Sequence, residues 1–291
     1  MSIRAVERII PAVSTSDGAG VRLYRSLGST QALRWDPFLM LDEFASDIPG
    51  EYIGGFPAHP HRGFETVTYM LDGHMRHEDS IGNRGDLGPG DVQWMSAARG
   101  IVHSEMPQQS EGRMRGFQLW INLPAEDKMR PAWYRDIPSA SIPVAPLEGG
   151  GRARVIFGSL VQGDAAITGP VAIASAATLY ADVHLPAGAR CTVPVGGQDR
   201  GLLYLYEGEA AAGADGPAIP RRAAALLGPG EQVAVQAGAA GARFLLLTGA
   251  PINEPIVQYG PFVMNTRAEI EQAIADFQAG RLGRDQGGAG P

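Results

Sequence analysis

The chain has 291 residues, of which 44% are hydrophobic and 19% are charged. This balance is close to that of ordinary globular proteins and excludes a chain that is disordered throughout. The formal net charge is −7 and the sequence has no basic cluster, which argues against direct binding to nucleic acid.

Cysteine content and hydropathy indicate the cellular compartment of the protein. Cys191 is the only cysteine, so an intrachain disulfide is impossible, as is typical of a reducing compartment. The first residues lack the apolar run of a signal peptide, and no segment reaches the ~20 apolar residues of a transmembrane helix. We therefore predict a cytoplasmic protein without a membrane partner.

Short apolar or alternating runs, bounded by turn-forming residues, recur along the chain and predict β-strands. With 39 glycines and 22 prolines, the chain favours an all-β fold with many tight connections. The clearest runs are Thr66–Leu71, Val92–Met95, Phe117–Leu123, Leu202–Tyr206 and Phe244–Thr248.

A faint internal repeat predicts two similar β domains. Tyr69–Gly73 (YMLDG) resembles Tyr204–Gly208 (YLYEG), and Leu87–Asp91 (LGPGD) resembles Leu227–Glu231 (LGPGE). Both matches occur in the same order at similar offsets, which indicates one supersecondary unit used twice. We predict an N-terminal barrel over residues 1–137, a Pro- and Gly-rich linker over 138–151, and a C-terminal barrel over 152–265.

One helix is predicted near the end of the chain, over residues 266–280. Thr266 and Glu269 form a capping box, and Gly280 is a typical stop. The apolar side chains at helical spacing are Ile270, Ala273, Ile274 and Phe277. The Gly-rich tail over residues 281–291 is predicted to be disordered.

The segment from His59 to Glu105 carries the candidate chemistry. Residues two apart in a strand share a face, so His59 and His61 can both point into the barrel. His103 and Glu105 satisfy the same rule on a second strand. Three imidazoles and a carboxylate would then meet inside the barrel. Such ligands suit divalent transition metals, and open coordination positions would leave room for substrate or dioxygen.

A barrel interior that is polar but holds no metal is the alternative. It would bury several imidazoles and a charge, each unpaired group costing about 1–3 kcal/mol, so metal binding is the better interpretation. Glu65 has the same parity as His59 and His61 and could be a ligand or a group that orients a histidine. His74 and His77, among charged residues after a turn, are interpreted as a solvated loop.

The predicted C-terminal barrel lacks the ligands. At an offset of 135 residues, His59 and His61 align with Pro194 and Gly196; at 140 residues, His103 and Glu105 align with Arg243 and Leu245, all non-ligands. One metal per chain is expected. Phe56, Trp94 and Met95 are candidates for the wall of a substrate pocket.

Four segments resemble the pirin family of the cupin superfamily. They are Leu33–Phe44 (LRWDPFLMLDEF), His59–Tyr69 (HPHRGFETVTY), Gly90–Pro107 (GDVQWMSAARGIVHSEMP) and Gln258–Asn265 (QYGPFVMN). The resemblance implies two tandem double-stranded β-helix (cupin) barrels with one Fe²⁺ in the first, held by residues that match His59, His61, His103 and Glu105. Mn, Co, Ni, Cu or Zn are alternatives. Glu65 would then not be a ligand.

The resemblance suggests two functions. Some bacterial members are similar to quercetin 2,3-dioxygenases, which open a flavonol ring with dioxygen and release carbon monoxide. In that case the partners are a small aromatic substrate and dioxygen, and Glu105 or Glu65 is the general base. Animal members act as metal- and redox-dependent transcriptional coregulators through protein partners, which is the alternative. A third interpretation is that the metal only stabilises the barrel.

Overall fold

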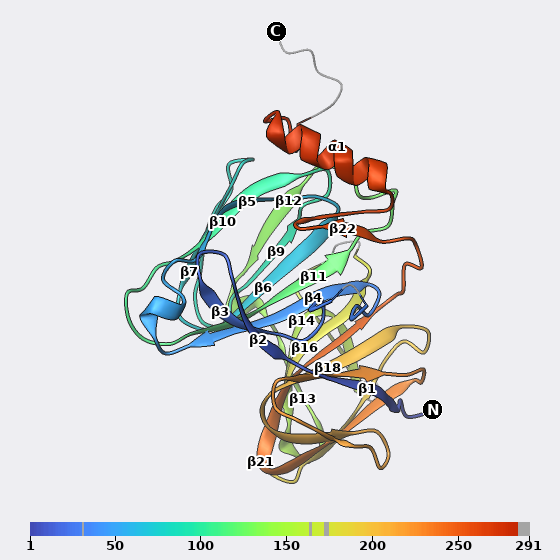
Figure 1. Ribbon diagram of the computed structural model, residues 1–291. Helices are drawn as coiled ribbons and strands as arrows, with labels where there is room; N and C mark the ends of the chain where they lie inside the picture. The colour runs from blue at the N-terminus through green and yellow to red at the C-terminus, as the bar shows by residue number, and fades with distance from the viewer. Residues whose placement is uncertain (31, 163–164, 172–174, 285–291) are drawn as a thin grey trace. The chain divides into compact units, whose positions relative to one another are not determined.

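The computed structural model describes residues 1–30, 32–162, 165–171 and 175–284. Within these ranges β-strands predominate, and the one α-helix, α1 (Arg267–Gln278), lies near the end of the chain (Figure 1). The prediction of an all-β fold with a short C-terminal helix is confirmed. No helix in the described ranges is both long enough and apolar enough to span a membrane.

The chain divides into two compact units, and neither is one continuous range. One unit, here the C-domain, comprises Met1–Thr15, Tyr24–Glu43 and Ile137–Pro251. The other, here the N-domain, comprises Ser16–Leu23, Phe44–Asp136 and the segment from Ile252 onward. The division therefore differs from the continuous ranges expected above. Strand pairing explains why the N-terminal segment belongs to the C-domain, because β1 (Val6–Pro11) pairs with β20 (Ala223–Leu227) of that domain.

Two sheets contain the strands from β2 to β12. One has the order β12-β9-β6-β11-β4-β3-β2 and the other has the order β5-β10-β7-β8. The predicted runs at residues 66–71 and 92–95 fall within β6 and β9, and the run at 117–123 falls in β11 except for its last residue. The elements are β2 (Val13–Asp17), β3 (Val21–Arg25), β4 (Phe38–Ser46), the 3-10 helix η1 (Pro49–Glu51), β5 (Phe56–His61), β6 (Phe64–Asp72), β7 (Met75–Asp79), β8 (Arg84–Leu87), β9 (Val92–Ser96), β10 (Ile101–Pro107), β11 (Met114–Asn122) and β12 (Trp133–Ile137).

A larger sheet forms the C-domain. Its order is β1-β20-β18-β21-β16-β14-β13, and β15, β17 and β19 pair with β14, β21 and β18. The elements are β1 (Val6–Pro11), η2 (Ser139–Ser141), β13 (Val144–Pro146), η3 (Glu148–Gly150), β14 (Arg152–Gln162), β15 (Ala165–Thr168), β16 (Ala177–Leu185), β17 (Arg190–Pro194), β18 (Arg200–Ala212), β19 (Ala218–Ile219), β20 (Ala223–Leu227) and β21 (Gln232–Gly249). The predicted linker thus contains a paired strand, β13.

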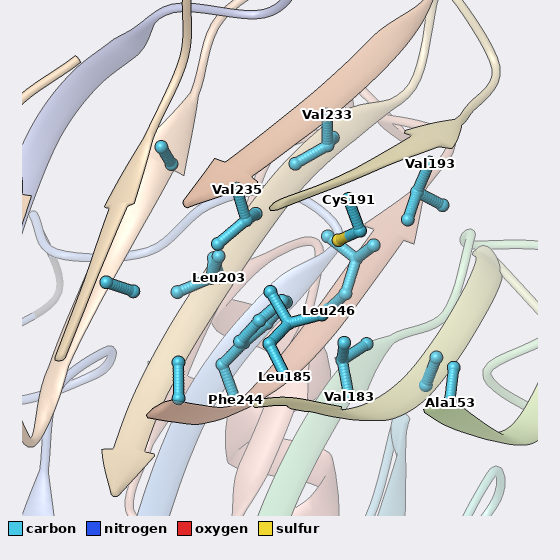
Figure 2. Packing of buried hydrophobic residues seen from close by; sticks show 14 of the residues in the cluster. Ala153, Val183, Leu185, Cys191, Val193, Leu203, Val233, Val235, Phe244 and Leu246 are labelled. Carbon is cyan, nitrogen blue, oxygen red and sulfur yellow. The ribbon is translucent and has the colours of Figure 1, made fainter. Parts of the chain in front are cut away.

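The interior of the C-domain is apolar. Val183, Leu203 and Phe244, from three neighbouring strands, are fully buried and belong to one cluster (Figure 2). Cys191 lies in the same cluster, and burial raises the pKa of its thiol to about 12. A thiol that stays protonated is a weak nucleophile, so Cys191 acts here as a small apolar side chain.

The internal repeat corresponds to equivalent positions in the two domains. Tyr69 lies on β6 and Tyr204 on β18, and both are buried. The glycines that close the two motifs, Gly73 and Gly208, have φ values of 88° and 78°. Gly73 follows the end of β6, whereas Gly208 lies within β18 next to a register shift, and both positions need the left-handed conformation that glycine adopts without strain. The repeat therefore reflects a similar strand and glycine position in both domains.

The C-terminal helix has the predicted capping box. The Thr266 hydroxyl accepts from the Glu269 backbone N–H at 3.3 Å, and the Glu269 carboxylate accepts from the Thr266 N–H at 2.8 Å. Ile270 and Ala273 are buried against the hairpin of β22 (Val257–Tyr259) and β23 (Phe262–Met264), but Phe277 is 42% exposed. Residues 285–291 of the predicted tail lie outside the described residues.

A buried lysine ties this hairpin to the rest of the N-domain. The Lys128 ammonium donates to the Gly63 carbonyl at 2.6 Å, to the Asn122 side-chain oxygen at 2.7 Å and to the Val263 carbonyl at 3.2 Å. Burial lowers its pKa to about 8. Its three donors are matched by three acceptors, which offsets much of the cost of burying the charge.

Substituting Lys128→Met should lower the free energy of unfolding by about 3–5 kcal/mol, because three buried acceptors lose their donor. Urea unfolding of the whole chain measures the change. Arg130→Met, which removes an exposed ion pair with Asp127, is the control and should change stability by less than about 1 kcal/mol. A Lys128→Met chain as stable as the unsubstituted chain would show that the ammonium does not hold the hairpin.

Candidate metal centre

Three histidines converge on one point between β5 and β10. The two strands pair antiparallel, with His59 opposite His103 and His61 opposite Ile101. The His59 Nε2 atom lies 3.0 Å from the Nε2 of His61 and 3.0 Å from the Nε2 of His103. The three candidate ligand nitrogens all lie within 4.8 Å of one another. The predicted grouping of the three histidines on one face is therefore observed.

The hydrogen bond of His59 at Nδ1 directs a lone pair of this ring at the cluster. The His59 Nδ1 lies 2.8 Å from the Pro57 carbonyl, which only accepts, so Nδ1 carries the ring proton and Nε2 carries a lone pair. Burial is the main cause that lowers the pKa of His61 and His103 well below the usual value, and neighbouring imidazoles lower it further. Neutral imidazole is the form that binds metals.

The spacing fits a divalent transition metal. Bonds of about 2.1 Å at right angles separate two ligand nitrogens by about 3.0 Å, whereas a tetrahedral angle separates them by about 3.4 Å. The two measured separations of 3.0 Å match the right angle. The donor set of three neutral imidazoles suits iron, manganese, cobalt, nickel, copper or zinc. This cluster could therefore hold a divalent transition metal.

Glu105 lies on the same strand face as His103, two residues further along β10. Its carboxylate is buried, and the Thr68 hydroxyl donates to Oε1 at 2.8 Å while the Gln118 amide approaches Oε2 at 3.4 Å. The register shifts between His103 and Glu105, so Glu105 pairs with Phe56. Among the described residues, the ligand atoms within 4.8 Å of one another come from the histidines and do not include this carboxylate.

Glu65 lies on the opposite face of β6, and the parity argument that grouped it with His59 and His61 is wrong. Gly63 has a φ of 90° and turns the chain between β5 and β6, so the alternation restarts there. The site face of β6 carries Phe64, whose ring lies 5.0 Å from that of His61, and Thr68, which contacts Glu105. Odd-numbered Glu65 points away from these residues.

Aromatic rings line one side of the cluster. Trp120 on β11 lies 5.2 Å from His61 and 4.3 Å from Phe64, measured between ring centroids. Of the predicted wall residues, Met95 pairs with Thr66 and so shares the site face of the sheet, whereas Trp94 pairs with Val67 and lies on the other face.

The third predicted wall residue, Phe56, packs against a separate apolar cluster that includes Val21 and Leu23. Phe64 and Trp120 are therefore the aromatic residues that lie against His61. The sequence could place neither of them, because their position depends on the pairing of β6 with β11.

His77 is a residue of the site that the sequence interpretation missed. It lies on β7 with no exposed surface, and its Nδ1 is 3.2 Å from the Nδ1 of His103. The interpretation as a solvated loop is wrong for His77 and right for His74, which is exposed. The signal was the alternation Met75-Arg76-His77-Glu78-Asp79, in which Met75 and His77 are buried and share the interior face.

The C-domain has no equivalent cluster among the residues that the structure describes. Arg243 and Leu245, which align with His103 and Glu105, lie on β21, and the apolar cluster described above takes their neighbours Ala242, Phe244 and Leu246 from the other face of that strand. The described residues contain one histidine cluster, which agrees with the expectation of a single metal site.

Comparison with known proteins identifies the family of the chain. The chain matches the family model described as Pirin over residues 20–121 and the model described as Pirin C-terminal cupin domain over residues 180–283. A Pseudomonas aeruginosa protein, whose name gives quercetin 2,3-dioxygenase as a provisional activity, is 53% identical over 92% of this chain and 94% of its own length. Human pirin is 40% identical over 92% of this chain and 90% of its own.

A solved structure shows the same architecture. The crystal structure of quercetin 2,3-dioxygenase from Acinetobacter baumannii has a TM-score of 0.87 and 34% identity, and the match covers 97% of this chain and 99% of that chain. The predicted pair of cupin domains is thereby confirmed. Since the two family models together span most of the chain and the relatives match along nearly all of it, this chain belongs to the pirin family.

Proposed function

We propose that this chain is a metal-dependent dioxygenase that binds Fe²⁺ through His59, His61, His103 and Glu105 and opens the ring of a flavonol such as quercetin. The observation that carries the proposal is the approach of the histidine Nε2 atoms to 3.0 Å, which a bound cation would stabilise. The names of the Pseudomonas relative and the Acinetobacter structure support the substrate class.

The proposed metal would supply Lewis acidity and a redox-active centre. Side chains of the protein would take up the substrate proton and bind the aromatic rings. Glu105 is the candidate base for the 3-hydroxyl proton of the flavonol. Its Oε1 lies 2.8 Å from the Thr68 hydroxyl, whereas Oε2 has only the 3.4 Å contact with Gln118. Oε2 is therefore the oxygen that can take the proton.

Trp120 is the candidate surface for the flat flavonol rings, and the fully buried Phe64 ring packs against it. Their own rings are 4.3 Å apart, with an interplanar angle of 31°, and Trp120 is partly exposed. An aromatic substrate beside them would exclude water from the histidine cluster. Glu65 receives no role in this proposal because of its position on the other face of β6.

Metal binding should stabilise the folded chain. At a free metal concentration of 100 Kd, the gain is about 2.7 kcal/mol, so Fe²⁺ added without oxygen should raise the melting temperature and chelation should reverse the change. His59→Ala should abolish the shift, and His184→Ala, in the C-domain, should retain it. An equal shift in the His59→Ala chain would contradict the ligand assignment. Elemental analysis of protein from its native host identifies the metal.

Turnover should depend on Glu105. Aerobic incubation of the Fe²⁺-loaded chain with quercetin should bleach the flavonol absorption band and release carbon monoxide. Glu105→Gln should lower kcat by about 10²–10⁴-fold through loss of the base and of a carboxylate that holds the metal. Thr68→Val, which removes one hydrogen bond to Glu105, should lower kcat by roughly tenfold.

His74→Gln, a change in an exposed histidine, is the control and should be as active as the unsubstituted chain. Absence of turnover with Fe, Mn, Co, Ni and Cu, in protein shown to bind each metal, would reject the quercetinase proposal. The regulatory function predicted from the family resemblance would then be the one to test.

A further inference from the structure

A row of hydrogen-bonding side chains runs from Asp79 through His77 to His103. The Asp79 Oδ2 lies 3.2 Å from the His77 Nε2, and the His77 Nδ1 lies 3.2 Å from the His103 Nδ1. The His77 and Asp79 side chains have no exposed surface, and His103 is 1% exposed. The Nε2 of His103, at the far side of its ring, is the atom that faces the histidine cluster.

The proton positions along this row follow from the carboxylate at its end. Asp79 accepts backbone N–H bonds from Ile81 and Asn83, so it is present as an acceptor and its contact with His77 requires a proton on the His77 Nε2. A neutral His77 then has a lone pair on Nδ1. The contact between the two Nδ1 atoms is therefore a hydrogen bond only if the proton belongs to His103.

We propose that His77 and Asp79 are positioning residues that fix His103 as its Nδ1–H tautomer and so present its Nε2 lone pair to the metal. This inference rests on the metal binding proposed above and adds two residues to that site. Groups that accept from the second nitrogen of a metal-binding histidine orient the ring and raise its basicity. Here the Asp79 carboxylate acts on His103 through the imidazole of His77.

The surroundings hold both residues in one arrangement. Asp79 Oδ1 and Oδ2 accept three bonds from the loop at residues 81–83, namely from the Ile81 N–H, the Asn83 N–H and the Asn83 side-chain amide. The Tyr134 ring stacks on His77 at a centroid distance of 4.6 Å and an interplanar angle of 27°. Neither side chain can turn without breaking these contacts, so the orientation is set before any metal binds.

The C-domain contains a similar pair that serves as an internal comparison. The His184 Nε2 lies 3.2 Å from Asp182 Oδ2, at the same two-residue spacing and the same distance as His77 and Asp79. Its Nδ1 faces the Arg152 guanidinium at 3.3 Å rather than a second imidazole. A histidine–aspartate pair is therefore not a metal-site feature by itself, and the distinguishing contact is that between His77 and His103.

Titration of the whole chain with Co²⁺, followed by the visible absorption of the bound ion, tests the proposal without relying on turnover. His77→Phe keeps the stacking on Tyr134 but removes the acceptor, and should weaken Co²⁺ binding by about 10- to 100-fold. His77→Asn places a carbonyl oxygen near the position of Nδ1 and should restore the affinity to within about threefold. His184→Phe is the matched control and should leave the Co²⁺ affinity unchanged.

Undiminished Co²⁺ affinity in a folded His77→Phe chain would overturn the proposal. So would the absence of rescue in a folded His77→Asn chain, because a purely structural role does not require an acceptor at this position.

A second measurement needs no variant. Nitrogen-15 NMR of the histidine-labelled, metal-free chain should show His103 protonated at Nδ1 and not at Nε2; the opposite tautomer would overturn the proposal even if His77→Phe does not fold. Failure of the unsubstituted chain to bind Co²⁺ would count against the metal site itself, and the tautomer would still decide the role of His77.

Discussion

Three imidazoles aim their Nε2 atoms at one point, and the His59 Nε2 lies 3.0 Å from the Nε2 of His61 and 3.0 Å from that of His103. Without a metal these nitrogens must share protons among themselves, whereas a cation at their centre would accept all three lone pairs. The surrounding structure is consistent with that requirement, since the lowered pKa of His61 and His103 keeps both rings neutral. The polar residues near them, Thr68 and Gln118, are tied to Glu105 rather than left without partners.

The two domains show how similar strands support different interiors. In the C-domain the inward positions are filled by Val183, Leu203 and Phe244, which stabilise the sheet by burial of apolar surface. In the N-domain the corresponding space holds imidazoles, a carboxylate and their hydrogen-bond partners. Such an interior contributes less burial energy by itself, so part of the stability of the N-domain is expected to come from the bound metal.

The strand that carries two of the histidines is fixed at its end by the C-terminal segment. Arg62, the residue after His61, forms a buried ion pair with Asp276 of α1 at 2.9 Å and donates to the Arg99 carbonyl at 2.6 Å. The Val263 N–H donates to the Arg62 carbonyl at 3.0 Å. Rigid placement of this residue limits the movement of His61, which is the condition for a preorganised site.

The sequence by itself determined the all-β class, the repeated unit, the helix cap at Thr266 and the shared face of His59 and His61, because each depends on turn chemistry or on alternation within one strand, whereas the pairing of β5 with β10 brings His103 to them. The tertiary structure decided which face a side chain occupies after a turn, which the alternation within one strand cannot predict. Gly63 reverses the facing of Glu65, and strand pairing brings His77 against His103. The assignment of separate chain segments to one domain depends in the same way on contacts between residues that are distant in sequence.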